Sequence, residues 1–141
     1  MNSINADKNK DTKLCAITST STHVVNVKVS NIKSHGYNNL LEWMSNEKDN
    51  IYIGRGRIVF IDGVRFPPTD SMWANPFKIN KNQSREEVLL MYSEYIEKKL
   101  ESDNNLINEL LKLKGKNLGC WCKPKCCHGD ILIKMIEKYN K

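Results

Sequence analysis

The residues best suited to chemistry gather near the C-terminal end of the chain. Four of its five cysteines lie in one short stretch, and a histidine follows them directly. These residues are Cys120, Cys122, Cys126, Cys127 and His128. Thiolates and imidazoles either bind metal ions or act as nucleophile and base. In a chain expected in a reducing compartment, this crowding favours a metal site or a reactive thiol over a disulfide framework.

The first interpretation of this stretch is a zinc site. Cys120 and Cys122 are separated by Trp121, so on a strand both thiols face one side and the indole faces the opposite layer. The side chains of Cys127 and His128 can lie beside these two thiols if the loop between residues 122 and 127 reverses the direction of the chain. Three thiols and one imidazole are the ligands of a closed tetrahedral zinc site. The ligands are spaced more closely than the separated pairs of common zinc modules, so zinc remains one alternative.

The second interpretation makes Cys127 a nucleophile. A thiol at a helix N-terminus beside an imidazole has a pKa lowered from its ordinary value of about 8.5, because the helix dipole and a cationic His128 favour thiolate. Asp130 then orients the imidazole or serves as acid or base. The plain structural alternative is that the cysteines are small core residues and Asp130 caps the helix.

A second group of candidate residues lies earlier in the chain and suits a phosphorylated ligand. Gly54 and Arg55 follow a short apolar segment, so backbone amides and a guanidinium there can reach a phosphate. Trp73 and Asn75 can stack on a base and form hydrogen bonds with it. The structural alternative is a turn with a solvated arginine and a packed loop.

The chain around these residues alternates between strand and helix patterns. We expect strands over 23–29, 51–53 and 117–121, and helices over 37–46, 85–101 and 130–139 with another after residue 101. Residues 69–82 show neither period and are expected to form a loop. The cysteine cluster would then join the end of a strand to the start of a helix. Such junctions form the ligand crevice of open α/β sheets.

Two local signals are more specific. Asp62 and Gly63 separate two short β-rich segments, a pair typical of a type I′ hairpin turn. Ser84 and Glu87 have the spacing of a capping box, which predicts a helix start at residue 85. We therefore predict a small single α/β domain with a short, mostly parallel sheet flanked by helices and a β-hairpin inserted near residues 58–66.

Composition limits the domain organisation and the partners. The 141 residues, 40% of them hydrophobic, can bury one core. Residues 1–21 are polar and predict a disordered tail, so the domain spans 22–141. No signal-peptide pattern or long apolar run occurs, so we expect a cytoplasmic protein without membrane contact. The formal net charge of +6 favours an anionic partner, a nucleotide or nucleic acid.

Several motifs in order along the chain resemble the domain of unknown function 4326 family. The motifs are VVNV at 24–27, YIGR at 52–55, WANPF at 73–77, REEV at 85–88, GKNLGCWC at 115–122 and CHGD at 127–130. The resemblance implies a compact α/β domain found in bacteria, phages and large DNA viruses, some of whose members are labelled as similar to polynucleotide kinase or phosphatase. The functional residues that it implies are Gly54, Arg55, Asn75, Cys120, Cys122, Cys127, His128 and Asp130. The hairpin at Asp62 and Gly63 departs from the shorter family pattern.

Together these patterns predict a nucleotide- or nucleic-acid-directed enzyme. Arg55 and helix amides would hold phosphate, Trp73 and Asn75 would recognise a base, and the cysteine, histidine and aspartate at 127, 128 and 130 would do the chemistry. The alternative is a non-catalytic nucleic-acid or protein binding module stapled by zinc. A thiol redox protein is a third reading, although the Cys-x-x-Cys spacing is missing.

Overall fold

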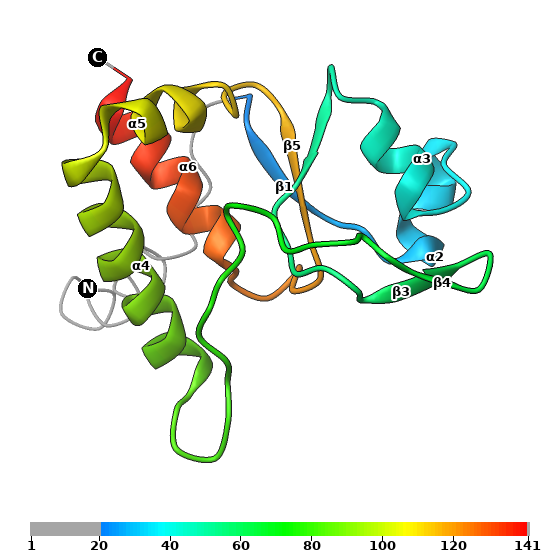
Figure 1. The fold of residues 1–141 in the computed structure, drawn as a ribbon, viewed down its shortest axis with the longest axis horizontal. Helices are drawn as coiled ribbons and strands as arrows, with labels where there is room; N and C mark the ends of the chain where they lie inside the picture. Colours follow the sequence, from blue (N-terminus) through cyan, green and yellow to red (C-terminus); the bar gives the residue numbers. More distant parts are fainter. Residues whose placement is uncertain (1–20, 141) are drawn as a thin grey trace, which may run out of the picture.

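The structure of the chain is a computed structural model, and it describes residues 21–140. The predicted tail over 1–21 lies outside the described residues except for Ser21, and Cys15 lies outside them as well. Figure 1 shows the described part as a central sheet with helices on both sides. Among residues 21–140, no helix is both long and apolar enough to cross a lipid bilayer.

The central sheet consists of three parallel strands in the order β1-β5-β2. They are β1 (His23–Asn26), β5 (Asn117–Cys120) and β2 (Asn50–Tyr52). This sheet confirms the predicted α/β class, and both of its strand pairings are parallel. The carboxyl ends of the strands therefore meet at one edge, where Asn26 pairs with Cys120 and Tyr52 pairs with Gly119.

The first strand is shorter than the predicted range of 23–29. It ends at Asn26, whose side-chain oxygen accepts a hydrogen bond from the Lys28 amide at 2.8 Å. This local bond competes with continuation of the strand. The chain then turns into a short helix, α2 (Val29–Ile32), that the β-branched sequence did not suggest.

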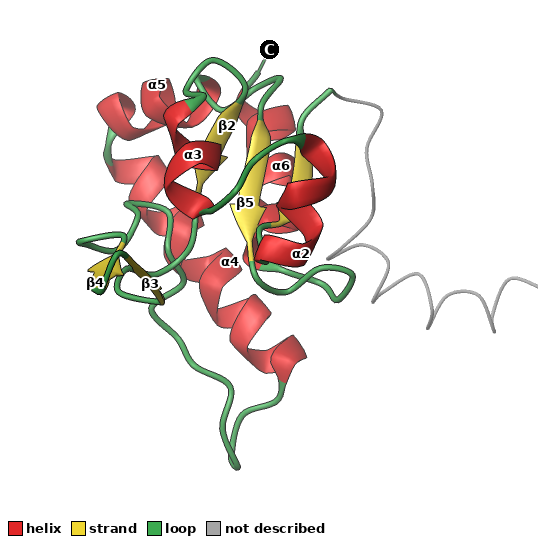
Figure 2. Cartoon of the chain, turned by 90° about the vertical axis from the view of Figure 1, so that its right-hand side faces the viewer, coloured by secondary structure: helices red, strands yellow, loops and turns green. Residues whose placement is uncertain are grey.

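One face of the sheet is covered by small helical elements (Figure 2). These are α2, the 3₁₀ turn η1 (Lys33–His35) and α3 (Leu40–Ser45), which lies within the predicted helix over 37–46. Their core comprises Val27, Ile32, Leu40, Trp43 and Tyr52. Gly119 lets the Trp43 ring approach the sheet, because an added Cβ would lie 2.5 Å from a ring carbon.

The other face carries the larger core and three longer helices. They are α4 (Arg85–Ser102), α5 (Asn104–Leu111) and α6 (His128–Tyr139). The predicted capping box starts α4: Ser84 accepts from the Glu87 amide, and Glu87 accepts from the Ser84 amide. Helix α6 contacts both β1 and β5. Its N-terminus lies beside the carboxyl edge of the sheet, because the Sγ atom of its N-cap Cys127 is 2.9 Å from that of Cys120, the last residue of β5.

The predicted hairpin is present as a separate two-stranded sheet, β3 (Val59–Ile61) and β4 (Val64–Phe66). Its turn residues have positive φ angles of 52° at Asp62 and 78° at Gly63, as a type I′ turn requires. The segment between β4 and α4 contains no helix and no strand of either sheet, which confirms the loop predicted over 69–82. This loop returns the chain past the sheet edge to the start of α4 (Figure 1).

Candidate functional site

A cavity of about 600 Å³ opens at the carboxyl edge of the sheet. It is lined by the chain that leaves β2, by the loop before α4, by the first turns of α4 and by the segment between β5 and α6. Seven of the eight functional residues that the family resemblance implies line it: Gly54, Arg55, Asn75, Cys120, Cys122, Cys127 and His128. The thiols, the imidazole and the guanidinium therefore share one cavity. Trp73 and Asp130 are not among the lining residues.

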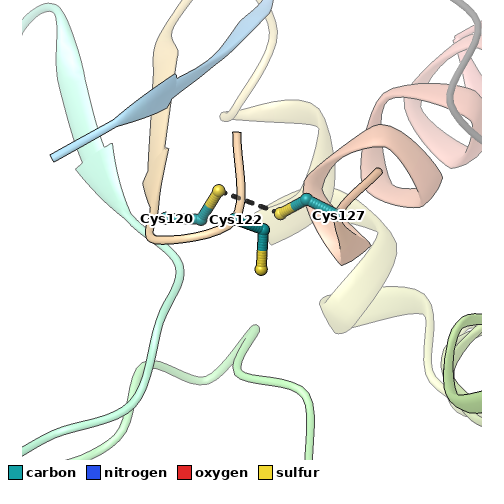
Figure 3. A group of neighbouring side chains, drawn as sticks. All are labelled: Cys120, Cys122 and Cys127. Carbon is teal, nitrogen blue, oxygen red and sulfur yellow. Dashed lines mark hydrogen bonds between the residues drawn. The ribbon is translucent and has the colours of Figure 1, made fainter. Parts of the chain in front are cut away.

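The floor of the cavity is a group of three thiols, shown in Figure 3. The Sγ atoms of Cys120, Cys122 and Cys127 all lie within 4.8 Å of one another. Cys120 ends β5 and Cys127 is the N-cap of α6, with 2.9 Å between their Sγ atoms. All three are free cysteines, and Cys122 is the least buried of them. The cavity also touches Cys126, which is not a member of the three-thiol group.

Two local features bring these thiols together. The segment after β5 reverses through a turn in which the Lys125 amide donates to the Cys122 carbonyl at 2.8 Å. The Cys127 Sγ then accepts a hydrogen bond from the Gly129 amide at 3.3 Å at the start of α6. The expected alternation also holds, because Cys120 packs in the larger core whereas Trp121 packs in the smaller one.

The three thiols do not titrate alike. The pKa of the Cys122 thiol is lowered to about 2, first by hydrogen bonds from Cys120 and Cys127 and then by the guanidinium of Arg85. Hydrogen bonding to Cys122 raises the pKa of Cys120 to about 11. Hydrogen bonding to Cys120 and Cys122 likewise raises the pKa of Cys127. The group therefore holds a single negative charge most readily on Cys122, not on the Cys127 that the sequence favoured.

The His128 imidazole lies beside the thiols and is buried. Its Nε2 is 2.7 Å from the Ile53 carbonyl oxygen, and its Nδ1 is 3.7 Å from the Cys127 Sγ. Burial lowers the pKa of the imidazole, so the neutral ring is favoured. A carbonyl can only accept a hydrogen bond, so Nε2 carries the proton and Nδ1 keeps a lone pair on the thiol side.

Arg55 reaches the cavity from the chain that follows β2. Its Nη2 donates to the carbonyl oxygens of Asn75 and Phe77 at 2.8 and 3.1 Å. The Asn75 side chain is occupied locally, because its oxygen accepts from the Phe77 amide at 2.9 Å. Arg55 thus fixes the loop before α4, while three of its five N–H donors stay unused by the residues that the structure describes.

Trp73 takes a different place from the one predicted. The residue is 3% exposed and packs in the larger core, and its carbonyl accepts a hydrogen bond from the Tyr92 hydroxyl at 2.8 Å. A buried indole cannot stack on a ligand base in the cavity. The predicted role in base recognition is therefore replaced by a role in packing the loop against α4.

Asp130 is also placed away from the predicted chemistry. Its carboxylate accepts from the Cys127 amide at 3.1 Å and pairs with Lys123 at 3.1 Å. The bond from the Cys127 amide is part of the capping box of α6. Asp130 is buried beneath this cap and does not line the cavity, so it positions the helix start instead of acting on a ligand there.

Two cations in the cavity wall escaped the sequence analysis. Arg85 begins α4, and its Nη1 donates to the Cys126 carbonyl at 3.2 Å. Lys78 lies in the loop before that helix. Together with Arg55 they give the lining three cationic side chains, and no carboxylate occurs among its described residues. Arg85 could have been predicted as a site residue because it stands at the start of a helix, where ligand sites often form. The sequence analysis used that position only to locate the helix.

Comparison with known proteins places the chain in a family. A profile described as a domain of unknown function (DUF4326) matches residues 40–138. The chain belongs to this family. The match begins at α3 and extends into the last turn of α6, so the whole cysteine cluster lies within the family domain.

Two proteins that are similar to this chain come from viruses. The chain is 39% identical over 101 residues to uncharacterized protein R718 of Acanthamoeba polyphaga mimivirus, covering 64% of this chain and 71% of that protein. It is 34% identical over 58 residues to an uncharacterized 12.4 kDa protein in the nrdA-td intergenic region of Enterobacteria phage T4. That match covers 41% of this chain and about half, 54%, of the phage protein. No solved structure matches the chain.

Proposed function

We propose that this protein binds a phosphorylated, nucleotide-sized ligand in the cavity at the carboxyl edge of its sheet. The observation that carries the proposal is the charge of the lining: Arg55, Lys78 and Arg85 contribute three cations, and the described lining residues include no carboxylate. Guanidinium and ammonium groups that have no carboxylate beside them in the lining attract phosphate, and of these three only Arg85 also interacts with the Cys122 thiol.

The size and the apolar part of the cavity suit the remainder of a nucleotide. A volume of about 600 Å³ falls within the range of small-ligand pockets. Ile58, Phe77 and Ile79 line it and offer apolar contact for a base or sugar. Its position at the carboxyl ends of parallel strands is the usual ligand crevice of α/β sheets.

The test is calorimetric titration with nucleoside mono-, di- and triphosphates, with inorganic phosphate and with unphosphorylated nucleosides. Phosphorylated ligands should bind, and nucleosides should not. Lys78→Ala should weaken binding about tenfold or more, because a charge-assisted contact is lost. Lys81→Ala is the matched control, since Lys81 lies on the same loop but does not line the cavity.

Two results would count against the proposal. One is that no phosphorylated ligand binds to the folded wild-type protein. The other is that Lys78→Ala and Lys81→Ala weaken binding equally, because the charge of the loop and not the cavity would then be responsible.

An enzymatic role is the second candidate, and the position of Cys122 favours it. Cys122 is half-buried and lines the cavity, whereas Cys120 and Cys127 are 1% exposed. A thiol acting on a bound ligand must reach the cavity in this way. Peptide mapping after brief iodoacetamide treatment should then show Cys122 as the fastest alkylated cysteine, with protection by the bound nucleotide. Slow alkylation that ligand does not change would remove this candidate.

A further inference from the structure

We propose that Cys120, Cys122, Cys127 and His128 form a closed, tetrahedral zinc site that joins the end of β5 to the start of α6. This inference does not require that a nucleotide binds, because it concerns the thiols and the imidazole at the floor of the cavity, and it shares only Arg85 with the nucleotide proposal. It assigns a metal and a structural role to residues that the sequence alone left divided between ligand, nucleophile and core.

The three sulfurs lie close enough together to share a metal ion. They come from the end of β5, the segment that follows it and the N-cap of α6, yet their Sγ atoms lie within 4.8 Å of one another. Figure 3 shows the sulfurs of Cys120 and Cys127 turned toward each other, with Cys122 beside them and its sulfur pointing away. Zinc–sulfur bonds of about 2.3 Å place the sulfurs of a tetrahedral site slightly under 4 Å apart. The Cys120 and Cys127 sulfurs lie 2.9 Å apart and all three sulfurs lie within 4.8 Å, so they would have to move slightly apart to reach this spacing.

The fourth ligand is argued from the orientation of the imidazole. His128 Nε2 lies 2.7 Å from the Ile53 carbonyl oxygen, which fixes the proton on that nitrogen. Metal-binding histidines usually donate their second ring N–H to a carbonyl or carboxylate in this way. The other nitrogen, Nδ1, lies 3.7 Å from the Cys127 Sγ and carries the free lone pair. It is therefore the nitrogen available to a metal held by the thiolates.

The identity of the metal follows from the donor set and its charge. Three sulfurs and one nitrogen are soft and borderline ligands, which select zinc over calcium or magnesium. Three thiolates with one Zn²⁺ carry a net charge of −1. The Arg85 guanidinium lies beside Cys122 and offsets this charge. Four protein ligands leave no open position, so the ion would act as a staple and not as a catalyst.

Such a site would also decide how Cys122 is used. A thiolate bound to zinc in a closed site is not available as a nucleophile, so the metal and the enzymatic candidate exclude each other at this residue. The cavity would then be a binding site whose floor is held rigid by the ion.

The experiment is elemental analysis of the full chain purified without chelator under anaerobic conditions. About one zinc per chain is expected, and Cys122→Ser should reduce this to near zero. Cys126→Ser is the matched control and should keep its zinc, because Cys126 adjoins the cluster without belonging to the three-thiol group. His128→Ala should weaken zinc binding in competition with a chromophoric chelator by at least about tenfold, the scale of effects expected around metal sites.

A spectroscopic readout covers the case in which a variant fails to fold. Cobalt substitution of the wild-type protein should give intense visible bands of a tetrahedral ion and a thiolate charge-transfer band in the near ultraviolet. Folded wild-type protein that stays metal-free after reconstitution overturns the proposal. So does a Cys120–Cys127 disulfide in the anaerobic protein, or equal zinc content in Cys122→Ser and Cys126→Ser.

Discussion

The imidazole of His128, at the start of α6, is tied through Nε2 to the backbone carbonyl oxygen of Ile53, one residue beyond the end of β2, at 2.7 Å. This bond links elements that are far apart in the sequence. It also lies under the cavity, because Ile53 precedes Gly54 and Arg55 in its wall. The orientation of the His128 ring is thus fixed by its hydrogen bond to Ile53, a residue distant in the sequence, and not by the adjacent Cys127.

Loss of this bond should destabilise the protein. His128→Ala leaves a buried carbonyl oxygen without its donor, and we expect a loss of about 1–3 kcal/mol in the free energy of unfolding. Urea denaturation with chelator present in all samples separates this effect from metal binding. His35→Ala is the control, because His35 is exposed and should change stability by less than about 0.5 kcal/mol. Equal stability of the two variants would contradict the argument.

Removal of Asp130 should affect folding and spare ligand binding. Asp130→Ala loses the cap on the Cys127 amide and the ion pair with Lys123, so stability should fall by about 0.5–2 kcal/mol. Nucleotide affinity at a temperature where the variant is folded should match the wild type, because the carboxylate does not line the cavity. Glu137→Ala, an exposed acidic position on the same helix, is the control for charge. Lost affinity in the folded variant would restore a functional role for Asp130.

Addition of one methyl group at Gly119 should disturb the sheet. The new Cβ would lie 2.5 Å from the Trp43 ring and 2.7 Å from a Val27 methyl carbon. Gly119→Ala should therefore cost about 1–3 kcal/mol, as overpacking of a core does. Trp43→Leu frees space, so the double variant should be more stable than the sum of the two single effects predicts. Additive effects in this cycle would show that the methyl group and the ring do not collide.

Tyr52 should make the protein sensitive to alkaline conditions. Burial raises the pKa of its hydroxyl from 10.0 to about 12, so the folded state keeps a proton that the unfolded state has already lost. The contribution of Tyr52 is fully present below pH 10 and is lost as the pH rises from 10 towards 12. In chemical denaturation across this range, Tyr52→Phe should lose stability less steeply than wild type. A Tyr52→Phe slope equal to that of wild type would contradict the assignment.

Several elements were predictable because their signals are local. Ser84 and Glu87 start α4 through contacts within one helical turn, and the Asp62–Gly63 pair forms the hairpin because both residues tolerate positive φ. The alternation of Cys120 and Trp121 between the two cores likewise follows from the two-residue period of a strand.

The composition of the site depended on long-range packing. Trp73 and Asp130 were expected in the site but do not line the cavity, whereas Lys78 and Arg85 line it and were not expected there. The sequence pattern around a loop tryptophan is the same whether the indole stacks on a ligand or packs against α4. The pattern around an aspartate in a first helical turn is likewise the same whether the carboxylate acts as an acid or caps the helix. Distant segments decide between these roles, because burial and hydrogen-bond partners are set by which elements meet. Local sequence patterns were therefore enough to predict most of the longer elements and the thiol-rich junction. Which side chains face the cavity depended on contacts between distant segments, as did the short helix α2 after β1.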